Sequence, residues 1–450
     1  MASLASRFDD SFLERAVAAV QLSRGAWADL FLERASTLRA EWDTRKGLRM
    51  TPGLREGFAL RRLELGHQRL ISEEGLWPER ILQVCGSGVD AGHSPATFAK
   101  NSEDFSDSTE ALRGRLMEEL GSALTSRLPP ESSCSLTLEW RERETSIAVR
   151  GWPIRRNRGT RVVVTCRLAG PSGALKAGLG MGSLEALASL RPVETLHRKL
   201  EERLRDEREA RDAPQGEFTV ILAPGTGGVF FHEACGHALE GDLVLRGSSP
   251  FRNLLGERVA PQFVGAMDDS SQPDLEGSYA FDDEGVPCRG TVLIAQGVLK
   301  AFLTDRIVGE RLGRGSTANG RRESFRDFPL PRMSNAFLMA GDEDPEEILR
   351  DTPMGIYVGH MEGGRVDPAT GEFHFRATQG SLIERGRLTA PLRPFTVSGN
   401  GPAALRGIQR LGNDLSWGDG AGSCGKDGQQ VPVAAGIPTL RVASLTVGPG

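Results

Sequence analysis

The hydrophobic and polar positions of the first part of the chain follow both helical and strand periods. Apolar residues recur near helical spacing over residues 8–24, which predicts an amphipathic helix. Strand patterns, alternating or rich in β-branched residues, occupy three further segments: residues 27–35, 136–143 and 160–170. Helices and strands therefore mix in this region, which predicts an α+β domain.

A highly charged segment follows over residues 182–212, with side chains of opposite sign four apart. Such pairs stabilise an exposed helix, so we expect one solvated helix that Pro214 ends. The helix marks a change in the character of the chain. It predicts a boundary between an amino-terminal domain of residues 1–212 and a carboxy-terminal domain of residues 213–450.

Short strand patterns separated by turn residues dominate the chain from Gly216 onward. Two apolar runs flank Gln296 and Gly297, which predicts a hairpin with these residues in the turn. The polar residues of the segment after residue 228 favour at least one helix. The overall expectation is an α+β protein of two domains, the second of them β-rich and carrying this helix.

Composition narrows the possible functions. The 450 residues are 39% hydrophobic and 26% charged, with a net charge of −5, which gives no reason to expect nucleic acid as a partner. No apolar run is long enough to span a membrane, and the amino terminus has no signal-peptide pattern. Six cysteines without paired spacing indicate reduced thiols. We therefore expect a cytoplasmic protein.

The octapeptide FHEACGHA, residues 231–238, carries the clearest chemistry. In a zinc peptidase helix the two histidines of H-E-x-x-H are four apart, whereas His232 and His237 are five apart. On an α-helix their side chains would diverge by about 140°. A π-type turn would align them, and Gly236 has no side chain to crowd such a turn. The octapeptide alone leaves two interpretations open, a metal site or unrelated polar residues on a helix.

A catalytic zinc site typically has three protein ligands and one open position. The best distant candidate is Cys424, whose small neighbours predict a tight loop rather than a packed strand. Cys235 points in a different direction from the histidines on the helix, so we expect it to pack in the core. The glycine turn before the motif lacks both G-x-G-x-x-G and G-K-[ST], which argues against nucleotide binding.

The segments HEACGHALEGD and GSCGKDGQ resemble the paired signatures of the TldD/PmbA metallopeptidase family, on the TldD side that keeps the metal motif. The resemblance covers residues 216–450 and is weak before them. Four more segments are similar to family segments in the expected order: residues 279–305, 318–335, 363–375 and 398–414.

This resemblance implies a zinc-dependent peptidase that cleaves short or unfolded peptides in an enclosed chamber. It implies His232, His237 and Cys424 as ligands of one Zn²⁺ and Glu233 as the catalytic carboxylate that accepts the proton of the zinc-bound water. It also implies a dimer, either of identical chains or of this chain with a PmbA-type chain.

Residues around the motif give further expectations. Glu240 and Asp242 follow the ligands closely, and a carboxylate there either accepts the free N–H of a ligand histidine or is an ordinary surface charge. The segment 306–332 is rich in arginine. Within it we expect Asn319, Arg321 and Arg322 to line the substrate chamber.

Two alternatives to a peptidase remain. The chain is a non-catalytic scaffold or peptide-maturation partner if the metal is structural, which a fourth ligand such as Cys235 or Glu240 would favour. A hydrolase of a non-peptide amide would use the same residues, and the sequence does not separate it from a peptidase.

Overall fold

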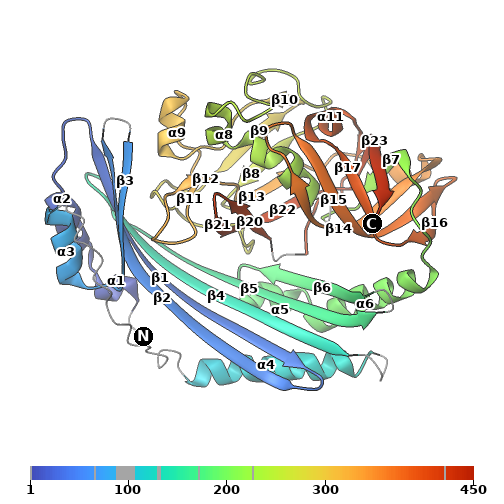
Figure 1. Ribbon diagram of the computed structural model, residues 1–450, viewed down its shortest axis with the longest axis horizontal. Helices are drawn as coiled ribbons and strands as arrows, with labels where there is room; N and C mark the ends of the chain where they lie inside the picture. Colours follow the sequence, from blue (N-terminus) through green and yellow to red (C-terminus); the bar gives the residue numbers. More distant parts are fainter. Residues whose placement is uncertain are drawn as a thin grey trace.

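The computed structural model describes residues 3–64, 67–87, 107–128, 133–170, 173–225, 228–419 and 422–450. A long curved sheet forms the amino-terminal part, and a β-rich carboxy-terminal body lies on the concave side of this sheet (Figure 1). Helices accompany the strands in both parts, so the predicted α+β class is confirmed. The division after residue 212 stays a prediction.

Six antiparallel strands form the amino-terminal sheet in the order β3-β2-β1-β4-β5-β6. Their bounds are β1 Trp27–Asp43, β2 Gly47–Glu64, β3 His67–Glu74, β4 Cys134–Val149, β5 Arg155–Gly170 and β6 Gly173–Met181. The three predicted strands are present as β1, β4 and β5. The first two extend well beyond their predicted segments because β1 pairs with both β2 and β4 over nearly its whole length.

Helices cover the convex face and one end of this sheet (Figure 1). They are α1 Leu4–Arg7, α2 Asp10–Ala19, α3 Pro78–Ser87, α4 Asp107–Thr125, α5 Leu184–Ser189 and α6 Pro192–Glu209. On the convex face Leu38, Leu138 and Val164 of the sheet are buried together with Leu120 of α4 and Leu200 of α6. The concave face is therefore the one turned toward the carboxy-terminal body.

The predicted helix over residues 8–24 is present but shorter, because α2 begins after the capping residue Asp9 and ends at Ala19. The prediction of a single charged helix over residues 182–212 is wrong. The segment forms two helices, α5 and α6, which are separated where Arg191 adopts a left-handed conformation (φ 47°).

Pro214 does not end α6, which stops at Glu209. The chain has already become extended at Ala210, and the backbone N–H of Arg211 donates to the carbonyl oxygen of Pro391. Pairing with a distant segment, which residue spacing does not reveal, therefore sets the end of this helix.

One sheet of the carboxy-terminal body runs β14-β7-β23-β17-β15-β16, with β18 paired to β23, and closes on itself because β14 also pairs with β15. Its strands are β7 Gly216–Leu222, β14 Met354–Val366, β15 Glu372–Glu384, β16 Arg387–Leu392, β17 Phe395–Asn400, β18 Ile408–Leu411 and β23 Leu440–Pro449. The pairing of β7 with β14 is parallel.

A second sheet runs β10-β9-β8-β13-β22-β19. Its strands are β8 Ala266–Asp269, β9 Gly290–Ala295, β10 Val298–Leu299, β13 Asn335–Leu338, β19 Ser416–Trp417 and β22 Ala434–Ile437. The predicted hairpin is confirmed: Gln296 and Gly297, both at positive φ, connect β9 to β10. Two two-stranded ribbons complete the body, β11 Gly320–Arg321 with β12 Leu330–Pro331, and β20 Ser423–Lys426 with β21 Gln429–Pro432.

The helical segments of the body are α7 Gly228–Phe231, a π turn His232–Gly236, a 3-10 turn His237–Leu239, α8 Gly241–Leu245, α9 Arg306–Arg311, α10 Pro345–Arg350 and α11 Gly401–Arg406. Phe230, Phe231 and Leu239 belong to one core with residues of both sheets. The motif is thus anchored at the centre of the body. No helix of the described residues is long and apolar enough to cross a membrane.

Candidate metal centre

The two histidines of the motif lie on a π turn. The backbone N–H of His237 donates to the carbonyl oxygen of His232, five residues earlier. The two imidazole rings have centroids 5.1 Å apart and planes at 85°. The predicted widening of the helix is confirmed, and it brings both rings to one side of the turn.

Two glycines allow other segments to approach this turn closely. Gly236 has an ordinary helical φ of −58°, and a Cβ atom there would lie 2.3 Å from Sδ of Met333. A Cβ atom on Gly401, the first residue of α11, would lie 1.9 Å from the carbonyl oxygen of Ala234. This refines the reason for a glycine at position 236: the absence of a side chain there makes room for the side chain of Met333.

Cys424 reaches the motif from the β20–β21 ribbon. Its Sγ atom lies 3.3 Å from Nε2 of His237, and one ligand atom from each of His232, His237 and Cys424 lies within 4.8 Å of the others. All three residues are buried. The expectation of a tight loop at Cys424 is wrong, because the residue is inside strand β20 and pairs with Val431.

The donor chemistry of this cluster fits a zinc ion. Two imidazoles and a thiol form a nitrogen and sulfur set of the kind that zinc binds. Nδ1 of His232 is buried and has no hydrogen-bond partner among the residues that the structure describes. Burial alone would raise the pKa of Cys424, but the adjacent His232 and His237 hold this pKa well below its usual value. The cluster therefore favours the thiolate, which is the form that binds metal.

Glu240 lies behind one of these imidazoles. Its Oε2 atom is 3.0 Å from Nδ1 of His237 and 2.9 Å from Nζ of Lys426. Burial would raise the pKa of Glu240, but the charges of Lys426 and His237 lower it to about 2. The ionised carboxylate thus accepts from Nδ1–H and leaves Nε2 facing the cluster.

Asp242 has a different position. Its Oδ1 atom accepts a hydrogen bond from Nζ of Lys426 at 2.6 Å, and no hydrogen bond to either histidine is present among the described residues. The sequence reasoning did not identify Lys426. The available signal was its place two residues after Cys424, on the same face of a strand.

Glu233 is the partly exposed member of the motif, with 30% of its side chain accessible. Its Oε2 atom lies 3.8 Å from Nε2 of His237. Cys235 is instead fully buried, with Sγ 3.9 Å from the carbonyl oxygen of Gly401, and burial raises its pKa to about 12. In the described part of the chain, the candidate ligand cluster contains three residues.

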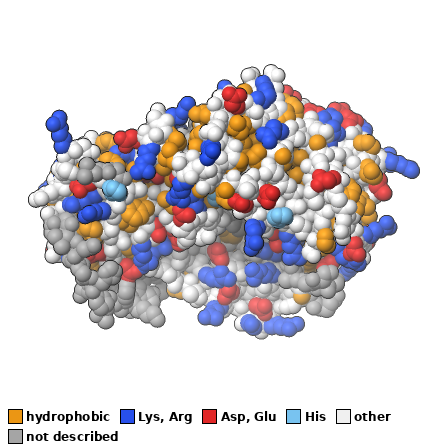
Figure 2. Space-filling view, turned by 45° about the horizontal axis from the view of Figure 1, so that its top comes forward, with side chains coloured by type: hydrophobic (Ala, Val, Ile, Leu, Met, Phe, Trp, Pro, Cys, Tyr) orange, Lys and Arg blue, Asp and Glu red, His pale blue; other side chains and the backbone are white. Residues whose placement is uncertain are grey.

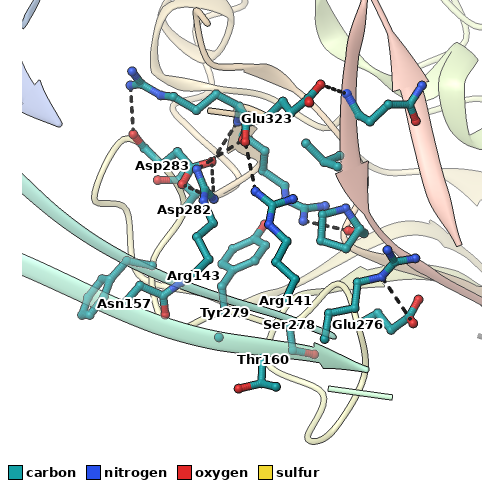
Figure 3. Close-up of a pocket in the computed structure, with 18 residues that line it drawn as sticks. Arg141, Arg143, Asn157, Thr160, Glu276, Ser278, Tyr279, Asp282, Asp283 and Glu323 are labelled. Atoms are coloured by element: carbon teal, nitrogen blue, oxygen red, sulfur yellow. Dashed lines mark hydrogen bonds and ion pairs between the residues drawn. The ribbon is translucent and has the colours of Figure 1, made fainter. Parts of the chain in front are cut away.

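The three residues expected to line a substrate chamber separate into two groups. Asn319 is buried, and its amide donates to Oδ1 of Asp268 and to the carbonyl oxygen of Arg332. Arg321 and Arg322 line a pocket of about 650 Å³, part of it open to solvent (Figure 3). The contact of Arg321 and Arg322 with substrate stays a prediction. Asn319 instead has a structural role, because its hydrogen bonds hold the segment just before β11 in place.

This pocket lies between β4 and β5 of the curved sheet and loops of the carboxy-terminal body (Figure 3). The ring of Tyr279 stands in its wall, with Arg321 over that ring at 5.2 Å. Gln430, Val431 and Pro432 of β21 line it as well. The ribbon that supplies Cys424 is therefore also one wall of the pocket.

Residues 215–449 match the family model described as the PmbA/TldA metallopeptidase C-terminal domain. Two curated relatives illustrate the similarity. A metalloprotease TldD homolog of Buchnera aphidicola is 40% identical over 53% of this chain and 50% of its own length. A zinc metalloprotease TldD homolog of Saccharolobus solfataricus is 35% identical over 55% of each chain. The matched region thus spans about half the length of these relatives.

The fold is similar over nearly the whole chain to a solved structure. The crystal structure of TldE from Thermococcus kodakarensis has a TM-score of 0.73, covering 97% of this chain and 99% of its own, at 16% identity. This likeness extends to the amino-terminal part, which lies outside the matched family model. At this identity it describes the fold and no activity.

Proposed function

Because the chain belongs to the TldD/PmbA metallopeptidase family, we propose that it is a zinc-dependent peptidase whose zinc ligands are His232, His237 and Cys424. The observation that carries the proposal is the meeting of these three buried side chains beside the accessible carboxylate of Glu233. The names of the curated relatives support zinc and proteolysis in general.

Glu233 is the residue that moves protons in this proposal. When bound, zinc would polarise a water molecule and the carbonyl group of the scissile amide. The Glu233 carboxylate, next to His232 in the chain, accepts the proton from that water and delivers it to the leaving amine. Its partial exposure supports this role, because a carboxylate in contact with solvent can be reached by water and substrate.

Glu240 and Lys426 hold the site in place. The Glu240 carboxylate fixes the tautomer and orientation of His237 through Nδ1, and Lys426 neutralises that buried carboxylate. Lys426 also donates to the carbonyl oxygen of Pro331. One lysine therefore ties the β20 strand to both the motif and the β11–β12 ribbon.

A structural metal in a non-catalytic scaffold is the alternative. Such a site usually has four protein ligands. Cys235 faces away into the core, and Glu240 uses its carboxylate on Nδ1 of His237. In the described residues neither of these two candidates for a fourth ligand belongs to the cluster of His232, His237 and Cys424, which favours the peptidase.

We further propose that the substrates are short or unfolded peptides and that the chain works in the cytoplasm as a dimer. The partner is either a second copy or a PmbA-type chain. The six free cysteines support a reducing compartment. An enclosed site between the curved sheet and the body would admit extended peptides and exclude folded proteins.

The decisive experiment is an assay of the purified chain, alone and with a PmbA-type partner, on a mixture of unfolded peptides. Mass spectrometry should detect cleavage in zinc-loaded samples and none after chelation. No chelator-sensitive cleavage in either form would favour the scaffold.

A further inference from the structure

Arginine side chains gather on the concave face of the curved sheet, where it meets the carboxy-terminal body. Arg141 and Arg143 of β4 and Arg161 of β5 line the pocket between the two parts. Arg141 is directly opposite Arg161 in the strand register. Like charges directly opposite each other on one face destabilise a sheet, so the pair needs a compensating anion.

Nearby carboxylates balance the positive charges of these three arginines to different extents. Arg161 is paired with Glu276 at 3.4 Å, and Arg143 lies 3.0 Å from Asp283. A third carboxylate, that of Glu33, has its Oε1 atom 2.7 Å from Arg143 and farther away, 3.8 Å, from Arg141.

The carboxylate of Glu33 has further partners besides Arg143 and Arg141. Its Oε1 atom also lies 3.3 Å from Arg55, and its Oε2 atom accepts from the backbone N–H of Phe325. One carboxylate thus faces three guanidinium groups, and the one at Arg141 is the most distant. Arg141 also donates a hydrogen bond to the backbone carbonyl oxygen of Glu323, at 3.3 Å.

Arg141 remains available to a ligand. A quarter of its side chain, 26%, is accessible, and it lines both this pocket and a neighbouring one on the sheet. Burial and the adjacent charge of Arg143 lower the pKa of Arg141 to about 10, so it is still a cation at neutral pH. In the view of Figure 2, basic side chains lie around the hollow between the two parts of the chain.

The charge of the whole pocket indicates the kind of anion. Five arginines and four carboxylates line it, a formal excess of one positive charge. A polyphosphate or a nucleic acid would meet the carboxylates of Asp282, Asp283 and Glu323 along the wall. A single carboxylate matches the excess, and a guanidinium binds it with two parallel hydrogen bonds.

The pocket is also next to the candidate metal centre. Val431, which lines the pocket, is paired with Cys424 in the β20–β21 ribbon. A peptide that extends from the metal centre past this ribbon would place a carboxylate near Arg141.

We propose that Arg141 binds a carboxylate of the peptide substrate, either the chain terminus or an acidic side chain, and so determines substrate preference. The inference rests on the proposed peptidase function for the identity of the ligand. The binding site itself rests on the pocket and its unevenly paired arginines.

Binding can be measured without turnover in the zinc-loaded Glu233→Gln chain by isothermal titration calorimetry. The probes are acetyl-trialanine, the same peptide with a carboxy-terminal amide, and an amidated tripeptide with a central glutamate. We expect a carboxylate-bearing peptide to bind at least tenfold more tightly than the neutral amide. The terminal and side-chain probes then distinguish the two sources of the carboxylate.

Arg141→Gln should abolish this preference, and Arg141→Lys should keep part of it. Arg39→Gln is the matched control, since Arg39 is on the same sheet, is exposed and is paired with Glu139. Thermal unfolding should show Arg141→Gln to be no less stable than the parent, because it removes a repulsion. A failure of that variant to fold would leave the lysine variant as the test.

Equal binding of all three peptides, unchanged preference in both Arg141 variants, or tighter binding of inorganic phosphate would overturn the proposal. If the preference is present but the zinc-loaded wild-type chain cleaves no peptide, the peptidase function fails and the carboxylate site stands.

Discussion

The backbone N–H of His237 is bonded to the carbonyl oxygen of His232, five residues before it. This hydrogen bond closes a π turn. On an α-helix the five-residue spacing would separate the two imidazoles, whereas on the π turn they lie together. The turn is stabilised from outside, by the close approach of α11 and of Met333, and not by an unusual backbone angle at Gly236.

Gly401→Ala should therefore disturb the metal centre from a distance. The new Cβ atom would overlap the carbonyl oxygen of Ala234, so the turn or α11 must move, at a cost of about 1–3 kcal/mol in unfolding free energy. Zinc affinity should fall in parallel. Urea unfolding and zinc competition measure the two effects. Gly363→Ala, where the added atom has open space, is the control, and equal behaviour of the two variants would refute the packing argument.

Two buried cysteines near the motif should respond differently to substitution. Cys424→Ser should lower the zinc content from roughly one ion per chain to nearly none, because one of three ligands is lost. Cys235→Ser should retain zinc, since its thiol faces Gly401 in the core. Atomic emission analysis of both proteins tests this, and zinc loss in Cys235→Ser alone would reverse the assignment.

Glu233→Gln should keep the metal and lose the reaction. The amide cannot accept a proton, so peptide cleavage should fall by about 10²–10⁴-fold. Zinc content and melting temperature should match those of the parent. Full activity in this variant would remove Glu233 from proton transfer.

Glu240→Gln and Asp242→Asn form a matched pair. Of these two carboxylates only that of Glu240 contacts His237, so Glu240→Gln should weaken zinc binding by about 10–100-fold. Asp242→Asn alters the contacts with Lys426 and Arg246, neither of which is a candidate ligand, and should change zinc affinity much less. Competition with a fluorescent chelator measures both, and the same loss in the two variants would indicate a general electrostatic effect.

The buried carboxyl group of Asp305 should make the stability of the folded protein depend on pH. Burial, with the adjacent charge of Glu284, raises its pKa from the usual value of 3.8 to about 7. The folded state therefore holds the proton longer than the unfolded state. The stability from this group is present below about pH 4 and is lost as pH rises toward 7, by at most about 1.4 kcal/mol per pH unit.

Asp305→Asn should flatten this slope while keeping the helix cap that Asp305 provides to Val308, because asparagine also caps helices well. Urea unfolding at several values between pH 4 and 7 compares the two proteins. Parallel slopes would show that Asp305 is ionised throughout this range in the folded state.

The sequence by itself determined the type of fold, three strands of the curved sheet and one hairpin of the carboxy-terminal body. Periods of two and turn residues such as Gln296 and Gly297 are local properties, so they predicted the hairpin correctly. The five-residue spacing of His232 and His237 likewise required a widened turn if both were to face one ion. The expected ligand set came from the resemblance to a family.

Only the tertiary structure decided what depends on distant segments. Residue spacing could not show that Arg211 pairs with the 391–393 segment and so ends α6 before Pro214. Nor could it show that Cys424 lies in a strand, or that Glu240 and not Asp242 contacts His237. The shortage of carboxylates around Arg141 arises where two parts of the chain meet. Pairing, burial and shared charges are made between residues far apart in sequence, and the fold alone brings them together.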